Sequence, residues 1–342
     1  MASLRWLAFP DKRLTVNGLA WFEETAPHLW RLPPRMKRIV RRPVWQLSMM
    51  PSGGRIRFST DSTSLAVRVR YKSLGHMNNM HRIGQAGIDC YIDGRFIRPV
   101  WPMKNGRSDL TFFEGYPRTR KEITLYLPLY HPVEILALGF DRGARIAPPR
   151  PFAVAKPVVF YGTSITQGGC ASHPGMSYQA IIGRMLNVDF ANLGFSGEGR
   201  GEPEMAAAVA EVDASCFVFD FGQNSPTVAE FAERYGPFID VVRRAHQKTP
   251  ILCNTPIFAT RTYHQKADRK RFDALSQVAR RTVAERIAAG DDNLRLIEGL
   301  MLLNQREADA TDDGIHPNDL GFQREAERWT PMIASALGMR WY

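Results

Sequence analysis

Cysteine is scarce in this chain of 342 residues, which contains only four. None of the four belongs to a C-x-x-C pair or lies near a histidine at metal-ligand spacing, so the sequence disfavours a zinc site. Two of them, Cys216 and Cys253, sit within apolar runs, where cysteine behaves as a small hydrophobic residue. We therefore expect free, buried thiols at these two positions.

Long hydrophobic runs are also missing. No stretch approaches the ~20 apolar residues that a membrane-spanning helix needs, and the N-terminus lacks the apolar core of a secretory signal peptide. We expect a cytoplasmic chain with no membrane partner, although a chain whose signal peptide had been removed would look the same. Repeats and low-complexity tracts are absent, and the proportions of 44% hydrophobic and 23% charged residues are typical of a globular protein.

Lysine accounts for only nine of the 45 basic residues, and the remaining 36 are arginine. The net charge of +11 is unevenly distributed: residues 1–150 hold 25 basic and 11 acidic residues, whereas residues 151–342 hold 20 and 23. A nucleic-acid-binding surface usually clusters its cations. Here they are spread singly along strand-like segments, apart from a run at 35–38 and 41–42. We interpret the excess as a solvated face and expect no nucleic-acid partner.

A proline-rich segment, Ala147–Pro151, divides the chain, because proline cannot continue a helix or a central strand. Before it, short apolar runs with a period near two alternate with turn signals such as Asp93-Gly94 and Asn105-Gly106. The runs are Ile56–Phe58, Leu65–Val69, Ile88–Ile92 and Ile123–Leu127. Many short strands with frequent turns predict an all-β sandwich over residues 1–150.

After this boundary, apolar runs alternate with segments of helical length. The runs are Val158–Tyr161, Val188–Ala191, Cys216–Phe221, Ile251–Asn254 and Leu294–Ile297. Thr227 and Glu230 form a capping-box pattern that opens one helix, and Lys266–Ala289 is long enough for another. Strands that alternate with helices predict an α/β domain over residues 151–342, with about five parallel strands buried on both faces.

Functional groups of an open parallel sheet gather at the carboxyl ends of its strands, so the loops that follow the strands are the places to search. The first loop, Gly162–Gly169, lacks the spacing of a phosphate-binding P-loop, and it is not a G-x-S-x-G elbow because position 166 is threonine. It does place Ser164 at the start of a helix, either as the N-cap or as a nucleophile.

Three later loops carry further candidates. The segment 192–201 is rich in glycine, which either lets backbone amides approach a ligand or simply makes a flexible loop. Asn224 follows the third strand, where asparagine is also a common turn former. Asp313 precedes His316 by three residues, so its carboxylate can hydrogen-bond the imidazole and set the tautomer. Four acidic residues close to His316 in the sequence form either a solvated loop or a metal site; they are Asp309, Asp312, Asp313 and Asp319.

The combination of these elements, in this order, resembles the SGNH (GDSL-type) hydrolase family. Gly162-Thr163-Ser164 is similar to the nucleophile motif, with threonine where many members have aspartate. Gly197 and Asn224 match the second and third motifs, and Asp313-Gly-Ile-His316 matches the last. Ser225 stands where many members carry aspartate, which puts the local loop geometry in doubt. The resemblance spans residues 160–318 and implies a flavodoxin-like three-layer α/β/α domain.

The N-terminal part is similar to a β-sandwich (jelly-roll-like) domain that precedes one GDSL-like subfamily. Its signature, Gly-x-Asp-Leu-Tyr, corresponds to Gly87–Tyr91 here, with Cys90 in place of leucine. Leu19–Phe22, Arg31–Pro33 and Pro43–Trp45 also look like that domain. Four of its tryptophans could stack on sugar rings or belong to the core: Trp21, Trp30, Trp45 and Trp101.

The family resemblance implies a catalytic triad of Ser164, His316 and Asp313, and an oxyanion hole formed by Ser164, Gly197 and Asn224. It implies no metal and no cofactor. We expect a serine esterase acting on small acyl esters, most of all acetyl groups on a carbohydrate, with a lipase, thioesterase or aryl esterase as the alternative. A different class, a glycan- or nucleic-acid-binding protein with a vestigial hydrolase domain, and a homo-oligomeric state are left open.

Overall fold

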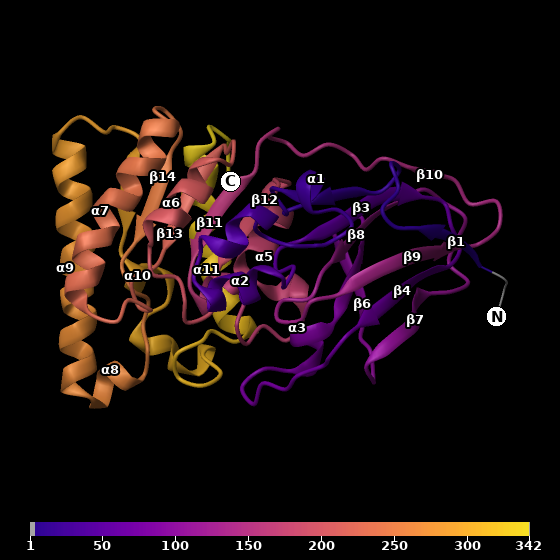
Figure 1. Ribbon diagram of the computed structural model, residues 1–342, viewed down its shortest axis with the longest axis horizontal. Helices are drawn as coiled ribbons and strands as arrows, with labels where there is room; N and C mark the ends of the chain where they lie inside the picture. Colours follow the sequence, from indigo (N-terminus) through magenta and orange to yellow (C-terminus); the bar gives the residue numbers. More distant parts are fainter. Residues whose placement is uncertain (1–3, 342) are drawn as a thin grey trace. The chain divides into compact units, whose positions relative to one another are not determined.

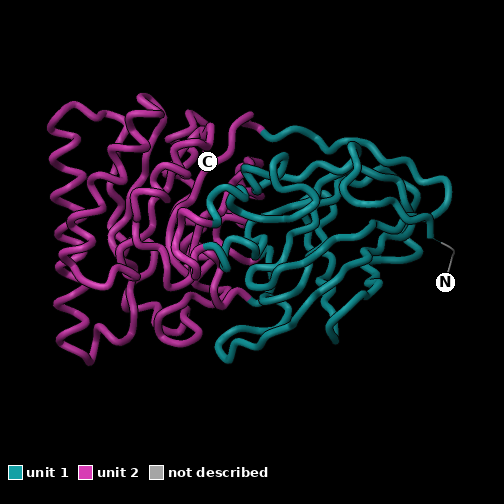
Figure 2. Tube along the Cα trace, viewed as in Figure 1, with its two compact units in different colours: residues 1–37, 45–152, 172–175 teal, residues 38–44, 153–171, 176–342 magenta. Residues whose placement is uncertain are grey.

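In the computed structural model, which describes residues 4–341, antiparallel strands precede a parallel sheet along the chain (Figure 1). The chain forms two units, coloured separately in Figure 2. The N-terminal unit contains residues 1–37, 45–152 and 172–175, and the C-terminal unit contains 38–44, 153–171 and 176–342. Each unit therefore includes a short segment from the other half of the sequence, and no sequence motif signals either one.

The N-terminal unit has two antiparallel sheets. One has the order β1-β9-β4-β7, and the other has the order β10-β3-β8-β5-β6, with β2 paired to β3. The strands of the first sheet are β1 (Arg5–Ala8), β4 (Leu65–Tyr71), β7 (Gly106–Phe113) and β9 (Glu134–Phe140). Those of the second are β2 (Thr15–Asn17), β3 (Arg55–Thr60), β5 (Ile88–Ile92), β6 (Arg95–Val100), β8 (Lys121–Tyr126) and β10 (Ile146–Ala147). Short helices connect them: α1 (Phe22–Thr25), η1 (Pro34–Arg38), α2 (Arg42–Ser48) and α3 (Arg82–Ala86).

One hydrophobic core joins these two sheets. It takes Val67 and Leu138 from the first sheet and Phe58 and Leu125 from the second, all of them buried. The apolar residues alternate with outward-facing ones along the strands, as in β7, because successive side chains of a strand point to opposite faces. The predicted β-sandwich is therefore confirmed.

Several charged residues of this unit are buried, so the arginine excess is not simply a solvated face. Arg31 is 1% exposed, and its guanidinium donates hydrogen bonds to the carbonyl oxygens of Met50 (2.8 Å) and Leu47 (2.9 Å). Burial lowers the pKa of Arg31 to about 9. Arg55, also buried, donates to the carbonyl oxygen of Gly53 at 2.6 Å. These cations hold turns of the sandwich together through backbone carbonyl groups.

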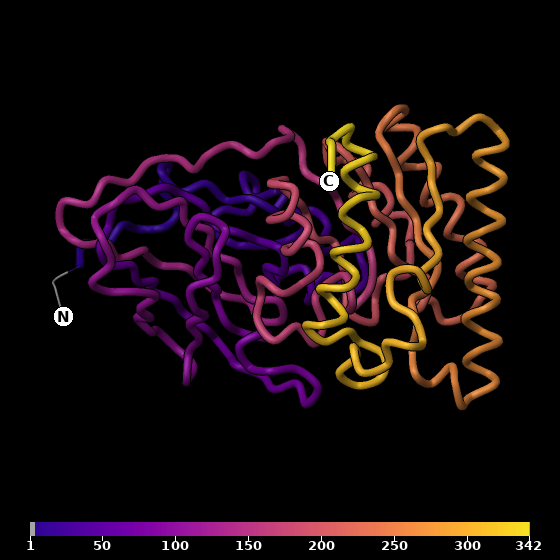
Figure 3. The backbone as a smooth tube through the Cα atoms, turned by 180° about the vertical axis from the view of Figure 1, so that it is seen from behind, coloured from indigo at the N-terminus to yellow at the C-terminus, as the bar shows by residue number. Residues whose placement is uncertain are grey.

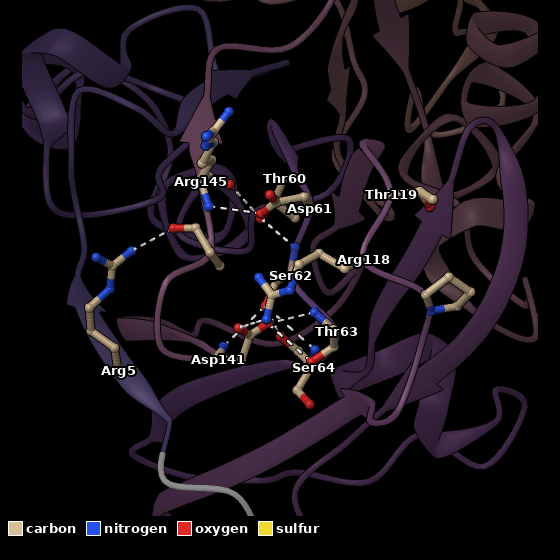
Figure 4. A network of polar contacts seen from close by, with 12 residues as sticks. Arg5, Thr60, Asp61, Ser62, Thr63, Ser64, Arg118, Thr119, Asp141 and Arg145 are labelled. Carbon is tan, nitrogen blue, oxygen red and sulfur yellow. Dashed lines mark hydrogen bonds and ion pairs between the residues drawn. The ribbon is translucent and has the colours of Figure 1, made fainter.

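A second polar network is centred on Asp141 (Figure 4). Its carboxylate accepts hydrogen bonds from Ser62 Oγ (2.8 Å), Thr63 N–H (2.6 Å) and Arg118 (2.5 Å). Burial raises the pKa of Asp141, but the hydrogen bonds from Arg118, Thr63 and Ser62 outweigh it and lower the pKa to about 2. The network ties β9 to the turn between β3 and β4.

The C-terminal unit contains a five-stranded parallel sheet with the order β12-β11-β13-β14-β15. Its strands are β11 (Val158–Gly162), β12 (Phe190–Gly194), β13 (Cys216–Asp220), β14 (Ile251–Asn254) and β15 (Leu294–Ile297). The first three are buried along their whole length, as expected for strands covered on both faces. Counted along the chain this order is 2-1-3-4-5, so the predicted flavodoxin-like α/β fold is confirmed.

Helices cover both faces of this sheet. Figure 3 shows α9 and α11 on opposite sides of it; α11 packs against α5, and α7 packs against α6 and α9. The longer helices are α5 (Tyr178–Leu186), α6 (Pro203–Ala210), α7 (Val228–Ala245), α9 (Lys266–Ala288) and α11 (Asp319–Ala336). The short ones are α4 (Ser164–Gln167), η2 (Pro174–Met176), α8 (Arg261–His264), α10 (Gly299–Leu302) and η3 (Gln305–Ala310). Across residues 4–341, no helix has the length and apolarity to cross a bilayer.

One predicted strand is displaced. The sequence places the second strand at 188–191, whereas β12 begins at Phe190. Asn187 ends α5 in the left-handed conformation (φ 51°), and the next amide, of Val188, still donates to Gly183 O at 3.1 Å. Val188 thus belongs to the end of the helix, where the left-handed residue redirects the chain before the strand can start.

Candidate active site

The loop after β11 places Ser164 at the first position of α4. The N-cap is Thr163 rather than Ser164: Thr163 Oγ1 accepts from Ile165 N–H, and Thr163 N–H donates to Thr166 Oγ1, which makes a capping box. The cap position is therefore already filled, and the hydroxyl of Ser164 serves another purpose. This site lies at the switch point of the sheet, because β11 has β12 on one side and β13 on the other.

The fold brings Ser164, just after the carboxyl end of β11, next to Asp313 and His316, which lie in the loop between η3 and α11. Ser164 Oγ lies 2.8 Å from His316 Nε2, and His316 Nδ1 lies 2.8 Å from Asp313 Oδ2. Asp313 Oδ1 accepts the backbone N–H groups of Ile315 (3.0 Å) and His316 (2.9 Å), which fixes the carboxylate relative to the ring. With the proton on Nδ1, this geometry leaves Nε2 as the acceptor for the serine hydroxyl.

Gly197 and Asn224 lie beside the same serine, in the lining of one pocket of about 420 Å³. Gly197 has a left-handed backbone (φ 72°), and among residues 4–341 its N–H has no hydrogen-bond partner. Asn224 Oδ1 accepts from Gly199 N–H at 3.4 Å, which leaves the side-chain amide Nδ2 as the donor. The pocket is lined by Thr163, Ser164, Ile165, Ser196, Gly197, Gln223, Asn224, Ile257, Phe258, Ala259, Arg261, Arg271, Phe272, Ile315 and His316.

A buried polar network supports α4, the helix that begins with Ser164, and the sequence motifs do not predict it. Thr166 Oγ1 donates to Asp220 Oδ2 (3.2 Å), and Asn192 Nδ2 donates to Thr166 O (2.6 Å). Asp220 Oδ1 also accepts from Asn254 Nδ2 at 2.8 Å. Burial raises the pKa of Asp220 above its ordinary value, against the opposing hydrogen bonds. The available signal was one polar residue in each of three otherwise apolar strands: Asn192 in the middle of β12, Asp220 at the end of β13 and Asn254 at the end of β14.

Arg41 is a second residue that the sequence did not single out. It comes from the basic run near the N-terminus, yet it belongs to the C-terminal unit. Its Nε donates to Glu202 Oε1 at 2.6 Å, Nη2 donates to Glu198 O at 3.3 Å, and Nη1 pairs with the Glu198 carboxylate. Arg41 therefore fixes the loop after β12 just beyond Gly197. The other basic residues of the run are exposed, as expected for a solvated face, so this contact corrects that interpretation for Arg41 alone.

The acidic residues near His316 do not form a metal site of their own. Within the described chain, one group of three metal-ligating side chains is close enough to share an ion, and it consists of Cys170, Asp313 and His316. Both nitrogens of His316 are already paired with Ser164 and Asp313. Burial, together with the nearby charges of Asp313 and Asp312, raises the pKa of the Cys170 thiol to about 12. The arrangement suits proton transfer better than metal binding, which needs a thiolate and a free imidazole nitrogen.

Two of the four tryptophans of the sandwich and its Gly-x-Asp-Leu-Tyr pattern have structural roles. Trp21 and Trp45 are 6% and 7% exposed, which places them in the core, whereas Trp30 and Trp101 are half-buried. Asp89 of the Gly-x-Asp-Leu-Tyr pattern is buried and accepts from Gly175 N–H at 2.6 Å. His173 Nδ1 lies 2.5 Å from the same oxygen of Asp89. The motif thus anchors the segment 172–175 to β5.

All four cysteines, including Cys216 and Cys253, are free and buried, as expected for the latter two.

Two family models match this chain. The model of the GDSL-like lipase/acylhydrolase family matches residues 155–334, and the model of the N-terminus of SGNH-hydrolase-type esterases, named for the GxDLY pattern, matches residues 4–146. No curated protein matches the chain significantly.

Solved structures similar to this one cover nearly its full length. A protein of Bacteroides ovatus described as a GDSL-like lipase is 28% identical, with a TM-score of 0.90 and 99% of both chains covered. A salicylyl-acyltransferase from a tetracycline biosynthetic pathway is 21% identical, with a TM-score of 0.84 and 97% of both chains covered. A family two carbohydrate esterase from Clostridium thermocellum is 20% identical, with a TM-score of 0.65 and 84% of this chain and 93% of that chain covered. The similarity to the latter two proteins shows that they share the fold of this chain.

Proposed function

The chain belongs to the GDSL-like lipase/acylhydrolase family and is an ester hydrolase; from this premise we propose that it is a serine esterase that removes small acyl groups, above all acetyl, from a carbohydrate. One observation carries the proposal. Two hydrogen bonds of 2.8 Å link Ser164 to His316 and His316 to Asp313, and both Ser164 and His316 line the pocket. Nucleophile, base and orienting group are the three parts that activate a serine hydroxyl.

In the proposed reaction, Ser164 Oγ attacks the ester carbonyl while His316 Nε2 accepts the hydroxyl proton. His316 then passes this proton to the departing alcohol oxygen, and the acyl group stays on Ser164. Asp313 holds the Nδ1–H and stabilises the imidazolium that forms in between. Water repeats the sequence on the acyl-enzyme: it gives its proton to His316, attacks the carbonyl and releases the acid, and Ser164 recovers its proton.

The negative charge that develops on the carbonyl oxygen needs donors already aimed at it. We assign this role to the N–H groups of Gly197 and Ser164 and to Asn224 Nδ2. The Gly197 N–H supports the assignment because it has no partner within residues 4–341, and Asn224 because its carbonyl oxygen is occupied by Gly199. The N–H of Ser164 lies at the start of α4, where the helix dipole favours negative charge.

The size of the pocket and the fold support a small ester on a sugar. A volume of about 420 Å³ is sufficient for an acetyl ester together with a sugar ring. The fold is shared with family two carbohydrate esterases and with an acetyl xylan esterase from Butyrivibrio proteoclasticus. A lipase or thioesterase on the same scaffold is the competing activity.

Mass spectrometry of acetylated oligosaccharides, before and after incubation with the enzyme, tests the proposal. We expect the wild type to remove acetyl groups and Ser164→Ala and His316→Ala to lose activity about 10⁴-fold or more, with folding kept. Ser215→Ala is the matched control, because Ser215 Oγ bonds Pro157 O before β13 begins, away from the strand ends that carry the site. A preference for long acyl chains in a panel of esters contradicts the carbohydrate assignment, and near-normal turnover of either triad variant contradicts the mechanism.

A further inference from the structure

The pocket beside Ser164 is unusually cationic for its size. Its lining contains two arginines, Arg261 and Arg271, and no aspartate or glutamate. The remaining walls are apolar, from Ile257, Phe258 and Phe272, or are formed by neutral polar groups. Two cations without a carboxylate in the same lining give the pocket a positive potential, which favours an anionic ligand over a neutral one.

The backbone fixes Arg261 relative to the catalytic histidine. Both the N–H and the Oγ1 of Thr260 donate to Gly314 O, at 2.7 and 3.0 Å. Gly314 lies between Asp313 and His316 and has φ 81°, and a Cβ at this position would lie 2.2 Å from Thr260 Oγ1. Only glycine allows this approach without a shift of Thr260. Arg261, the next residue, is therefore anchored to the loop that carries the base.

The side chain of Arg261 is held in place but not satisfied. It is 34% exposed, yet its Nε is buried and, within the described chain, has no hydrogen-bond partner. The carboxylate paired with it, Asp268 Oδ1, is 4.0 Å from Nε, which is too long for a hydrogen bond. Phe272 lies 5.4 Å from the guanidinium and restricts its movement. Within residues 4–341, neither terminal amino group of the guanidinium has a hydrogen-bond partner, and an anionic ligand atom in the pocket would supply one.

Arg271 has a different part in the same pocket. Its Nη2 donates to Ser225 O (2.6 Å) and to Gln223 O (3.3 Å), on either side of Asn224. These two bonds position the asparagine loop, and the positive charge of Arg271 still adds to the potential in the pocket. Arg261 is thus the candidate for direct contact, whereas Arg271 is a positioning residue.

We propose that this pocket binds a carboxylate on the substrate, close to the ester bond, and that Arg261 is its direct partner. The inference rests on the proposed esterase function and narrows its substrate class to anionic esters. Two sources share this chemistry: the acyl group can be a short dicarboxylic acid bound through one end, or the alcohol can be a uronic acid that carries the ester on a neighbouring hydroxyl.

Matched pairs of esters separate these sources. The first pair is phenyl hydrogen succinate and its neutral methyl ester, with the enzyme-free rate subtracted; the second is an acetylated methyl glucuronoside and the corresponding acetylated methyl glucoside. We expect the wild type to favour the anionic member of one pair by up to about fivefold in kcat/KM, because one partly exposed ion pair is worth up to about that factor. The pair that shows the preference identifies the source.

Arg261→Gln should remove the preference, Arg261→Lys should restore part of it, and about 1 M salt should weaken it in the wild type. Arg281→Gln is the matched control. Arg281 is an exposed arginine of α9, the helix that packs against α8, and it does not line the pocket, so its replacement should leave the preference intact. If Arg261→Gln folds poorly, competitive inhibition by free succinate, compared between the wild type and Arg261→Lys, gives the same answer.

Equal kcat/KM for the charged and neutral members of both pairs overturns the inference, as does a preference that survives Arg261→Gln. In either case the neutral esters are still cleaved, and the proposed esterase function stands. Failure to cleave any of the four esters, with Ser164→Ala indistinguishable from the wild type, instead counts against the esterase function itself.

Discussion

Asp141 in the sandwich and Asp313 in the α/β unit are both carboxylates that accept backbone N–H groups from a nearby turn. The Asp141 carboxylate also accepts hydrogen bonds from Arg118 and Ser62. In the part of the chain that the structure describes, none of these partners contacts a further reactive group, so the bonds serve only to hold strands together. The Asp313 carboxylate is also hydrogen-bonded to the imidazole of His316, and the other ring nitrogen of His316 faces the hydroxyl of Ser164. The same residue type thus stabilises one unit and, in the proposed mechanism, orients the catalytic base in the other.

What distinguishes the two regions is where their polar groups lie on the sheet. In the sandwich, buried charges such as Arg31 and Arg55 bond carbonyl oxygens of neighbouring turns. In the parallel sheet, polar residues stand at the carboxyl ends of adjacent strands, where the chain must leave the sheet and side chains from distant segments converge. Substitutions in the first region should therefore act on stability, and substitutions in the second on turnover.

Asn224→Ala provides the strongest test of this contrast. The loss of one oxyanion donor is typically worth about 10²–10³ in kcat, and the melting temperature should change little, because the side chain makes one long hydrogen bond, to Gly199. Steady-state kinetics on a small acetyl ester check the first point and thermal unfolding the second. A change confined to KM would mean that Asn224 binds ground state and transition state equally.

Arg41→Gln tests whether a residue from the N-terminal half of the sequence supports the catalytic loop. Without the contacts of Arg41 to Glu198 and Glu202, the loop beyond Gly197 should relax. We expect kcat to fall about tenfold with KM little changed, because a small displacement of a catalytic group lowers the rate of the chemical step strongly. Arg42→Gln, at the exposed neighbouring position, is the control. Partial recovery in Arg41→Lys would support a positioning role, whereas equal losses in both glutamine variants would refute it.

Asp141→Asn should have the smallest effect on catalysis and a clear effect on stability. We expect kcat to be unchanged and the melting temperature of the sandwich to fall by several degrees, because a charged hydrogen-bond acceptor worth about 1–3 kcal/mol is lost. Asp109→Asn, which removes a more exposed pair with Arg68, should shift it less.

The same substitution has a pH signature. The pKa of Asp141 is lowered to about 2 in the folded state, so its stabilising contribution is fully present above about pH 4 and is lost as the pH falls through 2. Thermal unfolding of the wild type and Asp141→Asn should therefore converge on acidification. A difference that stays constant down to pH 2 would show that the charge of Asp141 is not responsible.

Much of the fold could be predicted because hydrophobic periodicity is local. The strand at Ile88–Ile92 and the strands at Ile251–Asn254 and Leu294–Ile297 have the bounds that the apolar runs predict. The second strand of the parallel sheet begins two residues later than predicted, because a left-handed Asn187 extends the end of a helix, which periodicity does not report. Ser164 was weighed as an N-cap, and Thr163 fills that position instead.

The sequence by itself determined the two fold classes, the order of strands and helices, and the short motifs that include Ser164, Gly197, Asn224, Asp313 and His316, because each depends on residues within a few positions of one another. Only the tertiary structure decided how distant residues combine: Thr166 with Asp220 and Asn254, Arg41 with Glu198, and Arg261 with a pocket free of carboxylates. Strand ends and loops meet according to the topology of the sheet, and contacts between segments tens to hundreds of residues apart leave no periodic signal in the chain.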